Sequence, residues 1–419
     1  MDVDSLKEFI AKNESEYISL QKILTSHKAL APENGGDGEL EKCLALEKFL
    51  REHGFENLAR FDSPDERVSA KIRPNLVATI PGKNDDFAIW VIAHLDVVPA
   101  GDLSAWKTDP WQATEKDGKI FGRGVEDNQQ GLVSAFAAAW AFVKNGIAPE
   151  HTVKLLFAAD EEVGSKHGIF FLLKKHKKIL GKNDLFIIPD GGDKKGETLE
   201  IAEKNVLWLK FEIFGKQAHG SRPDQGKNAC LASAKFTSDL YDALHKKFKK
   251  QNPLFCPPHS TFEPTMRKAN VDGVNIIPGK EEFYFDCRII PEYSCDEVLQ
   301  SVEEVAQKAQ NEFGVKIKIS ILQKAQSRPT SANSKVVQKM SAALKKAHGI
   351  RSRTIGIGGG TVGAELRNNG FDCVVWSTLC DTAHMPNEFC VVKNLVRDAQ
   401  TLAVLFGEWE RADGGSWIL

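Results

Sequence analysis

The stretch FAIWVIAHLD, residues 87–96, decides the fold class of this chain. An unbroken apolar run over 87–93 is followed at once by His94 and Asp96. Such a run indicates a strand buried on both faces, which is typical of the parallel part of an α/β sheet. Ligands bind to such sheets at the carboxyl ends of the strands, and His94 and Asp96 point to the same side there because side chains alternate along an extended chain.

The same texture recurs on both sides of this stretch. Apolar runs alternate with helical spacing through the first 200 residues and again after residue 324. The expected strands are 75–80, 87–93, 152–159, 184–189, 354–357 and 372–378. The expected helices are 4–28, 38–53, 130–145, 165–180, 334–347 and 391–406. This order predicts an α/β sheet with helices on both faces.

The middle of the chain has a different pattern. Strands are expected at 206–215, 261–271, 281–290 and 315–322, with helices at 226–250 and 295–311. The order β-α-β-β-α-β is that of a ferredoxin-like α+β unit with an antiparallel sheet. We therefore expect one α/β domain formed by 1–203 and 324–419, interrupted by an inserted unit at 204–323.

Composition excludes several classes of protein. The 419 residues suggest two domains, and 55 Lys and Arg against 57 Asp and Glu leave a net charge of -2, with no electrostatic footprint for nucleic acid or a membrane surface. No apolar run approaches the ~18 residues of a membrane span, and the N-terminus does not resemble a secretory signal. The eight cysteines are scattered without a C-x-x-C pair, so we expect a cytoplasmic protein.

Four further polar clusters follow apolar or turn-rich segments. They are the GRGVEDN segment with Asp127, the acidic run at 160–162 with Glu161 and Glu162, the PDGG segment with Asp190, and the TAHMPNE segment with His384. Taken singly, each has a structural explanation: a helix cap, a solvated loop, or a histidine satisfied by a nearby acid.

Taken together, these clusters place two histidines and four acids at one edge of the predicted sheet. A mixed imidazole and carboxylate set suits zinc or a similar divalent ion. A shared carboxylate can bridge two such ions about 3.5–4 Å apart, as in two-metal hydrolases.

The order and wording of these motifs resemble a known family, the co-catalytic di-zinc amidohydrolases and exopeptidases. It includes succinyl-diaminopimelate desuccinylase, acetylornithine deacetylase, aminoacylase and glutamate carboxypeptidase. The motifs that carry the resemblance are HLDVVP (94–99), WKTDPW (106–111), GRGVEDNQQG (122–131), DEEVGS (160–165), PDGG (189–192), GKQAHGSRPDQGKNA (215–229), NIIPG (275–279), GGGT (358–361) and AHMPNE (383–388).

The resemblance implies a zinc-exopeptidase-like catalytic domain with a mixed sheet and two divalent metal ions. Zinc is the expected metal, with cobalt or manganese as alternatives. In the implied ligand set His94 and Asp190 hold one ion, Glu162 and His384 hold the other, and Asp127 bridges them. Asp96 would orient His94, and Glu161 would act as general acid and base. The family also implies a cis peptide bond between Asp127 and Asn128.

The inserted unit is implied to serve as a lid and as the surface of a homodimer. His219 would donate to the oxyanion of the transition state, in its own or the partner's site, although outside this motif it would be read as a surface histidine. Arg288, Asn275 and the loop of Gly359, Gly360 and Thr361 would contact substrate. Without the resemblance, Arg288 would be read as half of a structural ion pair.

The implied activity is hydrolysis of the amide bond of an N-acyl amino acid with a free carboxylate, through a water between the metals and Glu161 as base. The preferred interpretation is a desuccinylase or deacetylase, and the alternative is a dipeptidase or carboxypeptidase of the same family. A catalytically silent binding relative would have lost a ligand or the base, and none is missing. A nucleotide cradle at GGGT lacks the Gly-Lys-Ser/Thr that should follow. Substrate identity stays open, because Val362 stands where many relatives have an acid and Asn128-Gln129-Gln130 replaces their usual sequence after the bridging Asp.

Overall fold

The chain divides into two compact units in the computed structural model, which describes residues 2–407, 410–411 and 417–418. Unit 1 comprises 1–201, 330–354 and 361–419, and unit 2 comprises 202–329 and 355–360. The sequence placed the boundaries at 203/204 and 323/324 and did not assign 355–360 to the insert. These residues group with unit 2 because their backbone bonds to it: Lys204 N donates to Ile357 O at 2.9 Å, and Gly356 N to Leu254 O at 2.7 Å.

Unit 1 is built on an eight-stranded sheet, of which only the last residues of β10 and β17 are counted with unit 2. In spatial order its strands are β1 (Leu58–Arg60), β4 (Leu76–Ile80), β8 (His151–Ala158), β5 (Asn84–His94), β9 (Leu185–Asp193), β18 (Cys373–Thr378), β10 (Thr198–Glu203) and β17 (Arg353–Ile357). The central strands β8, β5, β9 and β18 are mutually parallel, whereas β1 pairs antiparallel with β4, β4 with β8, and β10 with β18. The mixed α/β sheet agrees with the predicted fold class.

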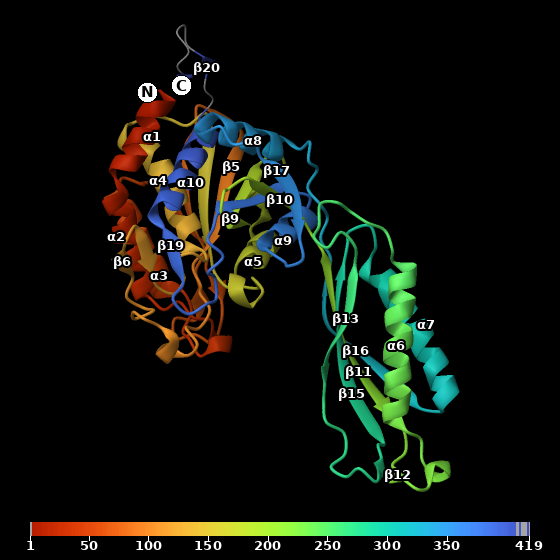
Figure 1. Cartoon of the computed structure of the whole chain (residues 1–419). Coiled ribbons are helices and arrows are strands. Elements are labelled where there is room, and N and C mark those ends of the chain that lie inside the picture. The colour runs from red at the N-terminus through yellow and green to blue at the C-terminus, as the bar shows by residue number, and fades with distance from the viewer. Residues whose placement is uncertain (1, 408–409, 412–416, 419) are drawn as a thin grey trace. The chain divides into compact units, whose positions relative to one another are not determined.

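Helices cover both faces of this sheet (Figure 1). One face carries α1 (Val3–Lys12), α2 (Glu14–Ser26), α4 (Gln129–Lys144), α8 (Lys335–His348) and α10 (Val392–Phe406), with α3 (Leu40–Glu52) packed on α2. On the other face, α5 (Ile169–Lys175) and α9 (Val362–Asn368) pack against Trp90, Ile92 and Val375. Because both faces are covered, β5 is apolar along most of its length, as the opening stretch indicates.

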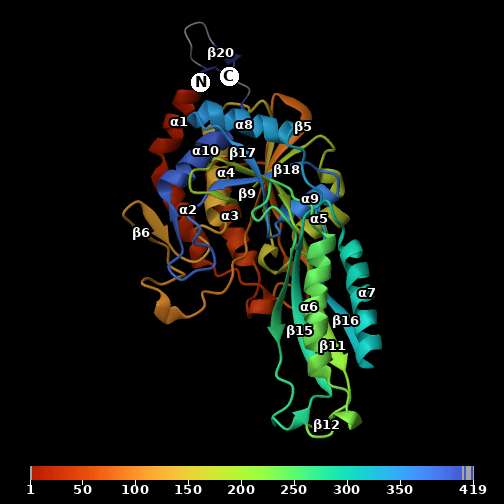
Figure 2. The ribbon, with the colours of Figure 1, turned by 45° about the vertical axis from the view of Figure 1, so that its right-hand side comes forward.

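Unit 2 is a four-stranded antiparallel sheet in the order β13 (Thr261–Arg267), β15 (Lys280–Ile289), β11 (Asn205–Phe214) and β16 (Lys316–Ala325). Helices α6 (Ala229–Lys247) and α7 (Cys295–Phe313) lie on one face (Figure 2). Along β11 the residues Leu207, Leu209, Phe211 and Ile213 are buried under these helices, while the residues between them face the other way. The chain order is the predicted ferredoxin-like one.

Two expected helices differ from the structure. The helix expected at 4–28 is two helices, since the chain breaks at Asn13, whose side-chain Nδ2 donates to Phe9 O at 2.7 Å and competes with the backbone. The helix expected at 165–180 is the shorter α5 followed by a 3-10 turn at Lys177–Ile179.

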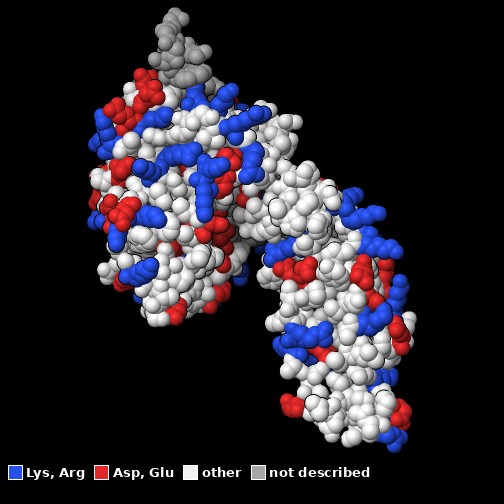
Figure 3. All heavy atoms as spheres, viewed as in Figure 1, with Lys and Arg blue, Asp and Glu red and all other residues white. Residues whose placement is uncertain are grey.

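The surface of the described residues carries both signs of charge. Figure 3 shows acidic and basic side chains intermixed on the face in view of each unit. No helix among the described residues combines the length and hydropathy of a membrane span.

Candidate metal centre

The polar clusters of unit 1 gather where its parallel strands end. His94 is the last residue of β5, Glu161 and Glu162 follow β8, and His384 follows β18. Asp190 lies on β9, and Asp127 stands two residues before α4 begins. Because β8, β5, β9 and β18 run parallel, their carboxyl ends meet at one edge of the sheet.

His94 is fixed in one tautomer by its own strand end. Its Nδ1 lies 2.9 Å from the carbonyl oxygen of Asp96, which can only accept, so Nδ1 carries the hydrogen. The other nitrogen, Nε2, faces two carboxylates, at 3.0 Å from Asp127 Oδ1 and 3.6 Å from Asp190 Oδ1. Because an unprotonated Nε2 and a carboxylate oxygen are both electron-pair donors, a proton or a metal ion must lie between Nε2 and these carboxylates.

His384 repeats this arrangement on the other side of Asp127. Its Nε2 lies 3.0 Å from Asp127 Oδ2 and 3.1 Å from Glu162 Oε2. Asp127 therefore presents one oxygen to each histidine. Ligand atoms of His94, Glu161 and Asp190 lie within 4.8 Å of one another, as do those of His94, Asp127 and Glu162.

The electrostatics of the cluster call for positive charge. Burial raises the pKa of Glu161 well above its usual range, and the charge of Asp190 raises it further. Burial alone would lower the pKa of His94, but Asp190 and Asp127 together hold it well above normal. Hydrogen bonds to Asp127 and Glu162 raise the pKa of His384 to about 10. This donor set of imidazole nitrogen and carboxylate oxygen fits zinc or a similar divalent ion.

Asp96 contacts the site through two different groups. Its carbonyl binds His94, while its carboxylate accepts Glu161 N at 2.9 Å and Glu162 N at 3.0 Å. The resemblance implied that Asp96 orients His94; in the structure the main-chain oxygen of Asp96 makes the hydrogen bond to Nδ1, while its carboxylate Oδ1 lies 3.6 Å from Nδ1. The Asp127–Asn128 peptide bond is cis, as the resemblance implied.

A buried ion network beneath the acidic loop was not found from sequence. Asp160 precedes Glu161 with a φ of 68°, and its Oδ1 lies 3.2 Å from Arg73 Nη2. Glu39 binds both the Arg73 guanidinium and Asp160 N, and His167 N donates to Asp160 Oδ2 at 3.0 Å. Arg73 and Glu39 are fully buried, which is rare for charged residues, and no local sequence pattern indicated their burial.

Unit 2 holds His219 and Asn275 side by side. The short strands β12 (Ala218–His219) and β14 (Ile276–Ile277) pair, and Gly220 N donates to Asn275 O at 2.7 Å. The backbone N–H of Ser221 donates to His219 Nδ1 at 3.2 Å, so the neutral ring carries its hydrogen on Nε2. His219 is exposed and offers a donor.

Arg288 and the glycine loop also meet within unit 2. Arg288 binds both carboxylate oxygens of Asp286, at 2.8 and 3.1 Å, and its Nη1 donates to Gly358 O at 2.9 Å. In unit 1, Thr361 caps α9, since its Oγ1 accepts Gly363 N at 3.0 Å. Arg288 is therefore engaged in the ion pair that its residue type alone suggested.

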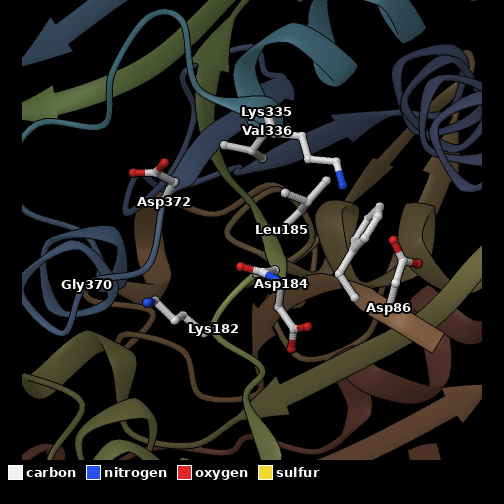
Figure 4. Close-up of a pocket in the computed structure, with 10 residues that line it drawn as sticks. Asp86, Lys182, Asp184, Leu185, Lys335, Val336, Gly370 and Asp372 are labelled. Carbon is white, nitrogen blue, oxygen red and sulfur yellow. The ribbon is translucent and has the colours of Figure 1, made fainter.

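A hollow of about 370 Å³ at the opposite edge of the unit 1 sheet has a different character (Figure 4). It lies where β5 and β9 begin, beside Asp184 and Lys335. Asp184 is buried and accepts N–H groups from Ala88, Trp90 and Gly181. The Lys335 ammonium lies 3.3 Å from the ring centroid of Phe87. These charged groups serve the packing of the sheet and do not converge on one point.

Known proteins resemble the chain over nearly its whole length. The model of "Peptidase family M20/M25/M40" matches residues 90–408. An uncharacterised metallohydrolase of Methanococcus maripaludis is 41% identical over 406 residues, which covers 92% of this chain and 97% of the relative. A succinyl-diaminopimelate desuccinylase of Rickettsia bellii is 26% identical over 377 residues, covering 89% and 92%.

Among solved structures, the aminopeptidase PepT of Bacillus cereus superposes with a TM-score of 0.76. It is 19% identical and the match covers 94% of this chain and 98% of that one, which shows a shared fold. Because the family model matches residues 90–408, which is most of the chain, the chain belongs to the M20/M25/M40 peptidase family and is a metal-dependent hydrolase of amide bonds.

Proposed function

We propose that this protein hydrolyses the amide bond of an N-acyl amino acid that has a free carboxylate, in the manner of a desuccinylase or deacetylase. The observation that carries the proposal is the carboxylate of Asp127 between His94 and His384, with Glu161 beside the His94 and Asp190 pair. His94, Asp190 and the shared Asp127 would hold one ion. Glu162, His384 and Asp127 would hold the other. We propose zinc for both, with cobalt or manganese as alternatives.

Two divalent cations there would polarise an amide carbonyl and make a nearby water more acidic. Glu161 then accepts a proton from the water whose oxygen attacks the carbonyl carbon. As the C–N bond breaks, Glu161 returns this proton to the departing amine nitrogen. Asp96 holds the loop of Glu161 by its carboxylate, which keeps the base beside the reacting atoms.

Residues of unit 2, together with Thr361 of unit 1, are proposed to bind the rest of the substrate. The Nε2–H of His219 would donate to the oxyanion, in its own site or the partner's. Asn275, Arg288, Gly360 and Thr361 would contact the substrate's carboxylate end. Arg288 would have to share its guanidinium between this group and Asp286, so its contribution is the weakest part of the set.

The decisive experiment compares Glu161→Gln with the wild type. We expect both proteins to bind two metal ions per chain, measured by elemental analysis. The substitution removes the base but no proposed ligand, so kcat/KM should fall by about 100- to 10,000-fold. Glu8→Gln, at an exposed position of α1, is the matched control and should leave the activity unchanged.

The substrate panel should contain N-succinyl and N-acetyl amino acids together with dipeptides. Preference for dipeptides would assign the protein to the peptidase alternative without changing the mechanism. Activity that survives Glu161→Gln would contradict the role of Glu161, and a wild type without bound metal would contradict the centre itself.

Two further properties are proposed. Unit 2 would form a homodimer, because its edge strand β16 exposes Ile321 and Leu322, apolar side chains that a second copy would cover. Sedimentation of the wild type and of Ile321→Lys tests this.

A reducing compartment, the cytoplasm, is proposed because all eight cysteines, which lie among the described residues, are free thiols.

A further inference from the structure

Two buried carboxylates next to the metal centre have no part in the chemistry proposed above. Glu126 precedes Asp127 and is 2% exposed, and Glu388 follows His384 by four residues and is 0% exposed. Carboxylates are almost never buried without hydrogen-bond or ion-pair partners, so the contacts of Glu126 and Glu388 indicate what holds them there.

Glu388 binds the segment that carries Asp127. Its Oε2 accepts Arg123 Nη1 at 2.7 Å and Gly124 N at 3.0 Å. Its Oε1 accepts Glu126 N at 2.9 Å and Asp127 N at 3.1 Å. Both oxygens thus receive two donors each, and one donor is the backbone N–H of Asp127 itself.

Glu126 binds the segment that carries His384. Its Oε1 accepts Cys380 N, and its Oε2 accepts both the backbone N–H and the hydroxyl of Thr382. Thr382 stands two residues before His384. The contacts are therefore reciprocal, since each segment extends a carboxylate into the backbone of the other.

We propose that Glu126 and Glu388 form a carboxylate clamp that sets the distance between Asp127 and His384, and with it the affinity of the cation position formed by Asp127, Glu162 and His384. The inference rests on the proposed metal centre. Hydrogen bonds to a charged acceptor are roughly twice as strong as neutral ones and stronger still when buried. The clamp thus holds Asp127 Oδ2 and His384 Nε2 3.0 Å apart although the two residues come from distant parts of the chain.

Amide substitutions distinguish this role from simple support of the fold. Glu388→Gln places an NH2 group against two N–H donors whichever way the amide turns. Glu126→Gln can keep its oxygen on Thr382 and lose only Cys380, so its effect should be smaller. Neither variant alters a proposed metal ligand.

Asp184 supplies the matched control. It is also a buried carboxylate that accepts N–H groups, from Ala88, Trp90 and Gly181, but it lies at the opposite edge of the sheet (Figure 4). Asp184→Asn makes the same chemical change away from the centre. His384→Ala is the positive control, because it deletes a ligand of the second position.

The test strips the full-length protein of metal and titrates it with Zn²⁺ against a chromophoric chelator, while thermal unfolding of the metal-free protein is followed in parallel. We expect the wild type and Asp184→Asn to bind two tight equivalents. Glu388→Gln should keep one and bind the other about 10- to 100-fold more weakly, as His384→Ala does. Glu126→Gln should show a smaller loss at the same equivalent.

If Glu388→Gln fails to fold, Thr382→Val carries the test, since it removes the hydroxyl donor to Glu126 without adding a polar group. It should weaken one equivalent only. Variants that unfold at lower temperature, as Asp184→Asn should, yet bind both equivalents like the wild type would overturn the clamp and leave a structural role. A wild type that binds no zinc would instead overturn the proposed centre, and this inference with it.

Discussion

At the scale of single residues, Asp96 shows how one residue can contact two parts of the candidate centre at once, through its main chain and its side chain. Its carbonyl fixes the tautomer of His94, and its two carboxylate oxygens each take one N–H of the acidic loop. The first contact belongs to the main chain and survives substitution. The second contact belongs to the side chain, and it fixes the position of the backbone at Glu161.

Asp96→Asn separates the two contacts. The variant keeps the carbonyl and so the orientation of His94, but its NH2 group opposes the N–H of Glu161 or Glu162. We expect kcat to fall by about 10- to 100-fold while two metal ions per chain remain. Steady-state kinetics and elemental analysis on the same preparation provide the check. Loss of metal at unchanged kcat per metal-loaded molecule would show that the carboxylate supports the ligands and not the base.

The place of the candidate site could be predicted from sequence because its polar clusters follow apolar strands, whereas the ligand set and the role of Glu161 came from the resemblance and stay a prediction. His94 ends β5 and Glu161 follows β8, and the carboxyl ends of parallel strands meet at one edge of the sheet. The partners behind them could not be predicted. Glu388 contacts Asp127 across 261 positions of the chain, and no local pattern records which distant backbone a buried acid will meet.

At the scale of elements, the strands and helices that could be predicted are those long enough for their hydrophobic pattern to repeat. Helix α9 has seven residues after a run of glycines, too few for a helical repeat to show. Strand β9 was expected to end at Pro189, which lacks an N–H, but it continues to Asp193. It does so because its pairing with β18 shifts register between Val375 and Ser377, where the ladder accommodates the interruption.

The contact of α8 with α10 makes stability depend on pH. His348 ends α8, and its Nε2 donates to Arg397 O of α10 at 3.1 Å. Burial, helped by the charges of Lys7 and Arg397, lowers the pKa of His348 to about 4, against 6.5 in the unfolded chain. Below pH 6.5 the unfolded chain binds the extra proton and the folded protein does not, so stability falls as the pH falls from 6.5 to 4.

His348→Gln should remove this dependence, because glutamine can still donate to Arg397 O but does not titrate. We expect the free energy of unfolding of the wild type to drop between pH 6.5 and 4 by about 1–2 kcal/mol more than that of the variant, after allowance for partial solvent screening. Urea unfolding of both metal-free proteins across this range measures the difference. Parallel pH profiles would show that His348 is protonated in the folded state.

At the scale of the whole molecule, the two units are stabilised by different means. Unit 2 has an apolar core of its own between its sheet and helices, where Phe211 stacks on Phe283 and the ring of Phe236 meets both edge-on. All the proposed metal ligands belong to unit 1, where five carboxylates lie close to two histidines: Asp96, Asp127, Glu161, Glu162 and Asp190 around His94 and His384. Bound cations would therefore stabilise the folded state of unit 1, whereas the apolar core of unit 2 contains no proposed metal ligand.

Metal should accordingly slow hydrogen exchange in one unit only. A ligand that binds only the folded state stabilises it by about 4 kcal/mol at a thousand times its Kd. With zinc, the slowest amides of β5 and β8 should exchange about a thousandfold more slowly than in the chelated protein, whereas those of β11 and β15 in unit 2 keep their rates. Exchange mass spectrometry on the full chain resolves these segments, and His384→Ala should reduce the effect. Equal slowing in β11 and β15 would contradict the argument, because it would mean that both units unfold in one cooperative step.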